Sequence, residues 1–219
     1  MATKDVLAEL STQFHAATGH WVATECAGGV DVAQRVQAGE AVDIVVLAAP
    51  VIDQLIREGK LLAGSRVDLV RSGVAIAVPA GAPEPDISSE AAVRQAVLGA
   101  KTLGYSTGPS GVYLVTLFER WGILETIKPR IVQAPPGVPV GRLVASGQVA
   151  LGFQQLSELM ALTGITVVGS LPPAIQSITT FSAGVACAST NVAMARKLTS
   201  FLSAPAAACI KIKHGMEPA

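Results

Sequence analysis

The chain has few aromatic residues, few charges and no long apolar run, and each shortage excludes a class of protein. Only 4% of its 219 residues are aromatic and 15% are charged, and the formal net charge is zero. No run of basic residues occurs, so the electrostatic footprint of a nucleic-acid-binding protein is missing. No stretch reaches the roughly 18 apolar residues that span a bilayer. We therefore expect no nucleic-acid partner and no membrane-spanning segment.

The chain also lacks the patterns that hold metals and cofactors. Its three cysteines, Cys26, Cys187 and Cys209, are widely separated and form neither a CxxC pair nor a metal-ligand spacing. We interpret them as small buried hydrophobic residues. No nucleotide fingerprint and no catalytic triad occurs either. The sequence therefore predicts no metal and no cofactor.

What the chain has in abundance is Ala, Val, Leu, Ile and Gly, in alternating helix-like and strand-like stretches. Half of the residues are hydrophobic, which suits buried strands covered by helices. Strands are predicted at 21–26, 44–49, 67–81 (as two runs), 101–106, 129–134, 149–155, 165–172 and 178–188. Helices are predicted at 5–19, 30–38, 51–62, 90–100, 112–122, 140–147 and 156–164, with two more within 191–215. This alternation predicts parallel sheets with helical crossovers.

Three loops that precede helices are rich in glycine or small residues. They are CAGG near Gly28 and Gly29, STGPSG near Ser110, and APPGVP near Pro139. Backbone N–H groups and the helix dipole at such a helix start attract an anion without a charged side chain. In parallel sheets, ligands bind where the carboxyl ends of strands meet helix N-termini. The loops therefore predict an anion-binding protein.

Two sets of side chains are candidates for contact with that anion. Thr107, Ser110 and Gly111 offer hydroxyl and amide donors, although Ser110 could equally act as a simple helix cap. Gln154 and Gln155 end an apolar strand, and consecutive strand residues point to opposite faces. We expect one of these glutamines to face the ligand while the other bonds to local backbone.

In order and spacing, four stretches resemble a known family. They are CAGGVDVAQRVQAGEAVDIVVLAA, STGPSGVYLVTLFERWG, GRLVASGQVALGFQQLSEL and FLSAPAAACIKIKHGMEP. Together they resemble the type II periplasmic solute-binding proteins of ABC transporters, in the molybdate-binding-like branch. That resemblance implies an α/β fold of two Rossmann-like lobes joined by two crossover strands, near Val74–Val78 and Thr179–Ala186.

The resemblance also implies a domain organisation and partners. Lobe 1 would comprise residues 1–78 with 179–219, and lobe 2 residues 79–178. A small anionic ligand would be held between the lobes without a cofactor, and a membrane permease would receive it. The residues implied for ligand binding are Ala2, Thr3, Gly28, Gly29, Thr107, Ser110, Gly111, Val138, Gln154 and Gln155.

The chain departs from the molybdate-binding pattern in ways that bear on the ligand. Molybdate binders carry hydroxyl side chains at the first helix and in the loop that corresponds to Gly28 and Gly29. They also place a tyrosine near the strand end where this chain has Gln154 and Gln155. Fewer hydroxyls and two carboxamides favour a planar or larger anion, such as a carboxylate.

An enzyme is the alternative, because GFQQLSE-like stretches are also similar to an isomerase of unsaturated tricarboxylates such as aconitate. Isomerisation needs a base that takes a carbon-bound proton. The acids that flank the first glycine loop are Glu25 and Asp31, and each could equally be a helix cap or a solvated carboxylate. A third hypothesis, the ligand domain of a transcription regulator, would need a helix-turn-helix segment upstream, and the chain contains none.

The compartment depends on the true start of the protein. No signal peptide is visible at MATKDVLAEL. The resembling family begins with an apolar strand, whereas Met1 already lies at the expected strand–helix turn. We expect a periplasmic protein if a leader was removed, and a cytoplasmic one if the chain is complete as given.

Overall fold

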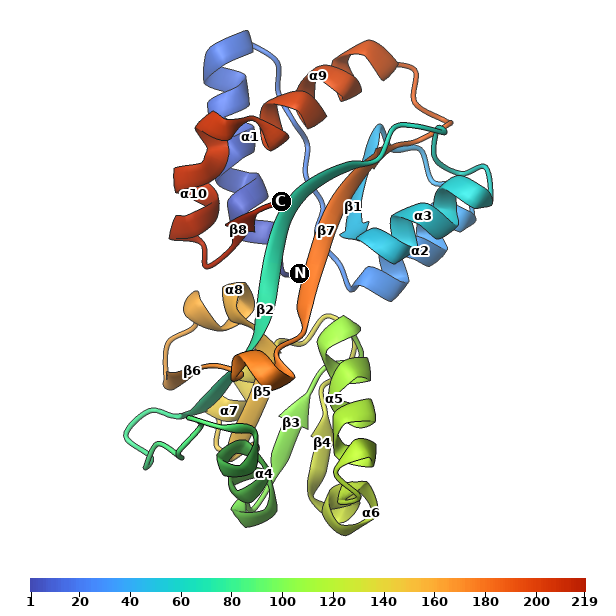
Figure 1. Ribbon diagram of the computed structural model, residues 1–219. Helices are drawn as coiled ribbons and strands as arrows, with labels where there is room; N and C mark the ends of the chain where they lie inside the picture. The colour runs from blue at the N-terminus through green and yellow to red at the C-terminus, as the bar shows by residue number, and fades with distance from the viewer. The chain divides into compact units, whose positions relative to one another are not determined.

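Two parts of the chain form separate units in the computed structural model, which describes residues 1–219 (Figure 1). Unit 1 comprises Met1–Ser72 and Thr179–Ala219, and unit 2 comprises Gly73–Ile178. The sequence-based boundary after residue 78 lies further along the same strand, β2. No break in apolar pattern marks the change of unit inside that strand, so local sequence offers no signal for it.

Unit 1 contains five α-helices and most of four strands. The helices are α1 (Lys4–Thr18), α2 (Gly29–Gln37), α3 (Ala49–Arg57), α9 (Val192–Ser203) and α10 (Ala208–Lys213), with a 3-10 turn at Pro205–Ala207. The strands are β1 (Ile44–Ala48), the first part of β2 (Val67–Pro79), β7 (Ile178–Val185) and β8 (Glu217–Pro218). The strand order is β1-β7-β2, and β8 pairs with β2.

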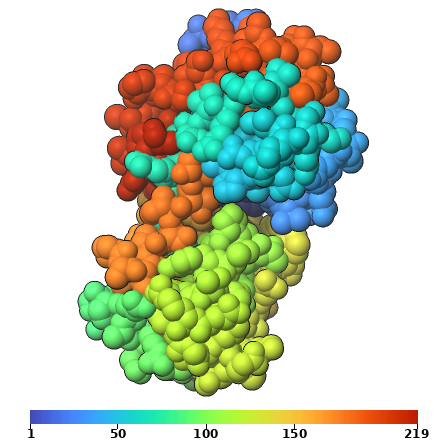
Figure 2. Space-filling view, turned by 45° about the vertical axis from the view of Figure 1, so that its right-hand side comes forward, coloured from blue at the N-terminus to red at the C-terminus, as the bar shows by residue number.

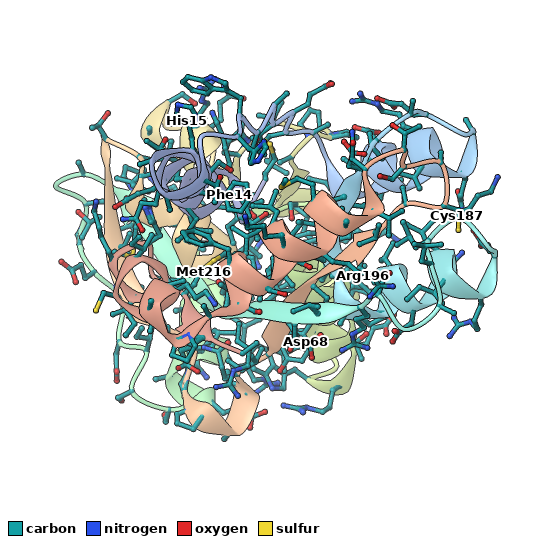
Figure 3. All side chains as sticks on the ribbon, turned by 90° about the horizontal axis from the view of Figure 1, so that it is seen from above. Phe14, His15, Asp68, Cys187, Arg196 and Met216 are labelled. Atoms are coloured by element: carbon teal, nitrogen blue, oxygen red, sulfur yellow. The ribbon has the colours of Figure 1, made fainter.

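Helices cover both faces of the unit 1 sheet. Side chains of β7 alternate between the two faces, so each face contributes to its own hydrophobic core. Phe181 and Ala183 pack with α1, α9 and α10. Gly184 points the other way, and a Cβ there would lie 2.7 Å from a Leu61 methyl group in the core under α2 and α3. Figure 3 shows Phe14 and Met216 between α1 and the two C-terminal helices.

Unit 2 contains the remaining elements. Its helices are α4 (Glu90–Gly99), α5 (Pro109–Arg120), α6 (Leu124–Ile127), α7 (Val140–Ala145) and α8 (Leu156–Met160), with 3-10 turns at Lys128–Arg130 and Pro173–Ile175. Its strands are the end of β2, β3 (Leu103–Tyr105), β4 (Ile131–Gln133), β5 (Leu151–Gln155) and β6 (Ile165–Ser170). The order is β2-β5-β3-β4, and β6 also pairs with β2. In Figure 2 the green-to-yellow atoms of α5 and α6 form one face of this unit.

The sheets are mixed, which corrects the prediction of parallel sheets throughout. Only β3 pairs in parallel, with β4 and β5. The pairs β1/β7, β2/β5, β2/β6 and β2/β8 are antiparallel. The physical reason is that β2 and β7 carry the chain from one unit into the other, so a helical crossover does not set their direction.

Other sequence-based predictions were wrong in detail. Residues 21–26 form no strand, because no neighbouring strand satisfies their backbone groups, and Trp21 is 83% exposed. The two strands predicted within 67–81 are one continuous strand, β2. All three cysteines are exposed rather than buried. Cys187, for example, lies in the turn after β7 (Figure 3).

Helix ends follow the predicted signals more closely. Gly19 ends α1 with φ of 75°, and Ser89 caps α4 by accepting a hydrogen bond from the Ala92 N–H. The longest helix, α1, has 15 residues. None of the helices combines the length and the apolar character that a bilayer crossing requires.

An acid-sensitive contact joins β2 to β7 in unit 1. Asp68 accepts hydrogen bonds from Arg66 at 2.8 Å and from the buried Ser182 hydroxyl at 2.6 Å. The Arg66 guanidinium lowers the pKa of Asp68, and Ser182 adds to the shift. A carboxyl group whose folded-state pKa is lowered stabilises the fold above its unfolded pKa, and this stabilisation is lost as the pH falls.

We therefore predict that Asp68→Asn lowers the free energy of unfolding by about 1 kcal/mol at neutral pH. The difference from wild type should shrink as the pH falls from about 5 to about 3. Urea unfolding across this pH range measures it, with Glu125→Gln on α6 as the exposed-carboxylate control. A difference that stays constant with pH would contradict the assignment.

Candidate functional site

In unit 2, three parallel strands end at one edge of the sheet, and each leads into a helix. Leu103 of β3 pairs with Ile131 of β4 and with Leu151 of β5, so the strands run side by side in the same direction. Helix α5 follows β3, α7 follows β4, and α8 follows β5. The starts of these helices therefore gather at the carboxyl edge, where open α/β sheets bind their ligands.

Glycines let the helices approach this sheet closely. A Cβ at Gly104 would lie 2.7 Å from Val149, and one at Gly152 would lie 2.4 Å from Val144 on α7. At the start of α5, a Cβ at Gly111 would lie 1.7 Å from the backbone oxygen of Ser106. The α5 terminus is thus pressed against the loop that follows β3, and only glycine fits there.

The start of α5 presents a buried hydroxyl that does not cap its own helix. Ser110 is 2% exposed, and the α5 terminus has no side-chain cap hydrogen bond. Instead, the Ser106 hydroxyl accepts from the Gly108 N–H at 3.3 Å. The Ser110 side chain therefore does not act as a helix cap. Thr107 lies in the same loop and is exposed.

The loop before α7 closes on itself. The Val138 N–H donates to the Pro135 carbonyl at 3.0 Å, and Gly137 adopts a φ of 75° that suits the turn. Val138 is half-buried. Its amide is therefore already engaged within the loop.

The two glutamines at the end of β5 are both buried and serve different faces. The Gln154 carboxamide accepts from the Gly141 N–H of α7 at 3.3 Å and donates to Glu158 at 2.5 Å. The Gln154 side chain is therefore bonded to groups of α7 and α8. Alternation along the strand places Gln155 on the face of Phe153, which packs in the same core as α5.

Sequence reasoning missed two residues in the first turn of α8. Glu158 is half-buried, and burial raises its pKa, although the hydrogen bond from Gln154 opposes the shift. The Ser157 hydroxyl is buried and has no hydrogen-bond partner. The sequence signal for Glu158 was an acid four residues after Gln154, in the stretch GFQQLSE that follows an apolar strand.

In unit 1, the starts of α1 and α2 lie next to each other. The amino group of Met1 donates to the Ala27 carbonyl at 3.4 Å, which joins the α1 terminus to the glycine loop. Ala2 and Thr3 are buried, and the Thr3 side chain forms no cap hydrogen bond to α1. Gly28 is the N-cap of α2, and Gly29 is its first residue. The structure thus brings together the four unit 1 residues that the resemblance implies.

The two acids flanking the glycine loop differ in their surroundings. Both oxygens of Glu25 accept from Arg35, at 2.6 and 2.9 Å. This hydrogen bonding by Arg35 lowers the pKa of Glu25, so Glu25 is a weak base on an exposed ion pair. Asp31 lies in the first turn of α2 and is half-buried.

No group of three His, Cys, Asp or Glu residues is arranged to hold a metal ion. The donors at the carboxyl edge of the unit 2 sheet, and those at the starts of α1 and α2 in unit 1, are backbone amides, hydroxyls and carboxamides. Such donors can bind an anion by hydrogen bonds and helix dipoles alone.

Comparison with known proteins assigns this α/β arrangement to a family. The model for bacterial extracellular solute-binding proteins matches residues 1–217. The chain therefore belongs to the bacterial extracellular solute-binding protein family. The sequence-based resemblance to this class of protein is confirmed.

Individual relatives add detail. The chain is 38% identical over 187 residues to an aconitate isomerase from Pseudomonas sp., covering 84% of this chain and 70% of the relative. It also shares its fold with the periplasmic molybdate-binding protein of Azotobacter vinelandii, with 23% identity, 98% and 95% coverage and a TM-score of 0.78. A third relative is AgtB from A. tumefaciens R10 in complex with agropinic acid, with 12% identity, 100% and 80% coverage and a TM-score of 0.77.

We predict that Gly111→Ala destabilises the protein by about 3 kcal/mol, because its Cβ would collide with the Ser106 backbone rather than with a flexible side chain. Gly108→Ala is the matched control, because its Cβ would only reach ordinary contact with the Ser106 hydroxyl, at 3.4 Å. Denaturant unfolding of both variants provides the measurement. Equal stability of the two would contradict the close approach of α5.

Proposed function

We propose that the protein binds a small anion through backbone and side-chain donors at helix starts, as the solute-binding component of an ABC-type uptake system. The observation that carries the proposal is the convergence of α5, α7 and α8 at the carboxyl edge of β4-β3-β5. Membership of the solute-binding family supports it. A periplasmic location and delivery to a membrane permease belong to this same proposal.

The chemistry of the donors favours a carboxylate over a tetrahedral oxyanion. Gly28 and Gly29 contribute no hydroxyl at the start of α2, and the Gln154 carboxamide is engaged by Gly141 and Glu158. The other candidate donors are the Ser110 hydroxyl and the helix-start amides in unit 2, and the Thr3 hydroxyl in unit 1. Fewer hydroxyls suit a planar carboxylate that accepts along two oxygens.

A ligand screen tests the proposal. Ligands that bind the native state raise its melting temperature, so thermal shifts should be largest with small di- and tricarboxylates such as aconitate and citrate. Molybdate, tungstate and sulfate at matched ionic strength provide the comparison. Calorimetry should then show saturable binding with the ligand recovered unchanged. Stabilisation by molybdate or tungstate alone would overturn the preference for carboxylates.

A charge placed at the α2 terminus separates binding from folding. Gly29 is exposed and its Cβ would meet only Leu47 at 3.6 Å, so Gly29→Asp should fold, and the helix dipole should favour its charge. The same charge should repel an anionic ligand and weaken binding by at least about tenfold, or about 1.4 kcal/mol. Gly29→Ser is the neutral control. Calorimetry measures the affinity of each variant for the ligand. Equal affinities of the two variants would show that the start of α2 does not bind the ligand.

An isomerase of an unsaturated small carboxylate is the second candidate function. The specific observation in its favour is the 38% identity to an aconitate isomerase over most of this chain. Two acids were first considered as the base. Arg35 binds Glu25 and lowers its pKa, which makes Glu25 a weak base. Asp31 is the other candidate. Incubation with cis- or trans-aconitate distinguishes the two functions, because an isomerase interconverts them and a binder does not.

A further inference from the structure

We propose that Glu158 is the base that removes and returns a carbon-bound proton during isomerisation of an unsaturated small carboxylate. This inference rests on the isomerase candidate described above. Glu158 was not among the acids that the sequence suggested, and it lies on α8 of unit 2.

Its position in the fold supports the role. Glu158 lies in the first turn of α8, directly after β5, at the edge where α5 and α7 also begin. Ser110 opens α5 at the same edge. Helix α5 packs on the face of the sheet that carries Phe153, and α8 packs on the opposite face. A substrate carboxylate held at the α5 terminus would therefore be bound at the same carboxyl edge at which α8 and Glu158 begin.

The carboxyl group is also held in a fixed orientation. Its Oε2 accepts from the Gln154 carboxamide, and the Gln154 carbonyl is fixed in turn by the Gly141 N–H of α7. Oε1 forms no hydrogen bond with another side chain or with the backbone. A base oriented by a second group, which a third group holds, is the arrangement that proton-transfer sites use.

The charge environment distinguishes Glu158 from acids with a structural role. In unit 2, Arg120 binds Glu90 at 2.8 Å and Lys128 binds Glu125 at 3.3 Å. Arg35 binds both Glu25 and Glu40 in unit 1. No arginine or lysine side chain forms an ion pair with Glu158. A carboxylate that no arginine or lysine binds, in partly desolvated surroundings, has greater proton affinity than those bound by arginine.

The reaction balances with this residue alone. The Glu158 carboxylate takes a proton from a methylene group next to the double bond, and the C–H electron pair forms a new C=C bond. The old π pair shifts to the far carbon, and helix-start amides at α5 stabilise the charge that develops on the conjugated carboxylate. Glu158 then returns the proton to the far carbon. The double bond has moved, the base is regenerated, and no oxidant or cofactor is consumed.

The test uses aconitate as the probe, in ²H₂O, with the whole chain. NMR follows interconversion of the cis and trans isomers and deuterium entry at the methylene carbon, while calorimetry gives the affinity. Glu158→Gln preserves the acceptor for Gln154 and removes the base. We expect it to lower kcat and the exchange rate at least a hundredfold while the affinity changes less than threefold. Glu125→Gln, an exposed acid on α6, is the matched control and should behave as wild type.

The outcomes separate this inference from the function on which it rests. A wild-type chain that binds aconitate but neither isomerises nor exchanges it overturns both. A wild-type chain that isomerises while Glu158→Gln keeps its kcat overturns the role of Glu158 alone, as does loss of activity only in Asp31→Asn. If Glu158→Gln does not fold, Glu158→Asp decides. A lowered kcat at unchanged affinity supports the proposal, and an unchanged kcat overturns it.

Discussion

Close approach between backbone and helix is the constraint on which the unit 2 site depends. Helix N-termini can share one edge only if their helices pack tightly on the strands that precede them. Gly104 and Gly152 make room for Val149 and the α7 valines, and Gly111 lets α5 press against the Ser106 carbonyl. These contacts place backbone amide donors at the edge, so the proposed binding of an anion would be a consequence of packing.

The acids of this protein are of two kinds, which differ in the group that binds the carboxylate and in the direction of the pKa shift. The carboxylates held by arginine, such as Asp68 and Glu25, have lowered pKa values and stabilise local structure. Glu158 is held by a neutral carboxamide and has a raised pKa because of burial. Retaining such a group costs stability, and chemistry at the same edge would explain why this chain places one there.

Binding a carboxylate and isomerising it require nearly the same structural features. Both need amide N–H groups that donate hydrogen bonds to a carboxylate at a helix start, and both need the ligand shielded from water. An enzyme needs in addition one group that can exchange a proton with carbon. A solute-binding framework can therefore give rise to an isomerase through a single well-placed acid, which makes the identity to an aconitate isomerase compatible with the family assignment.

The sequence by itself determined most helices and strands, the helix-start glycine loops and the family, because caps, apolar periodicity and glycine positions act within a few residues. It could not show that residues 21–26 lack a partner strand, that β2 and β7 pair antiparallel with their neighbours, or that the cysteines are exposed. It also could not assign Gln154 to Gly141 and Glu158, or Glu25 to Arg35. Those outcomes depend on which distant segments come together, and only the tertiary structure decides them, because hydrogen bonds and burial are formed between residues that no local pattern relates.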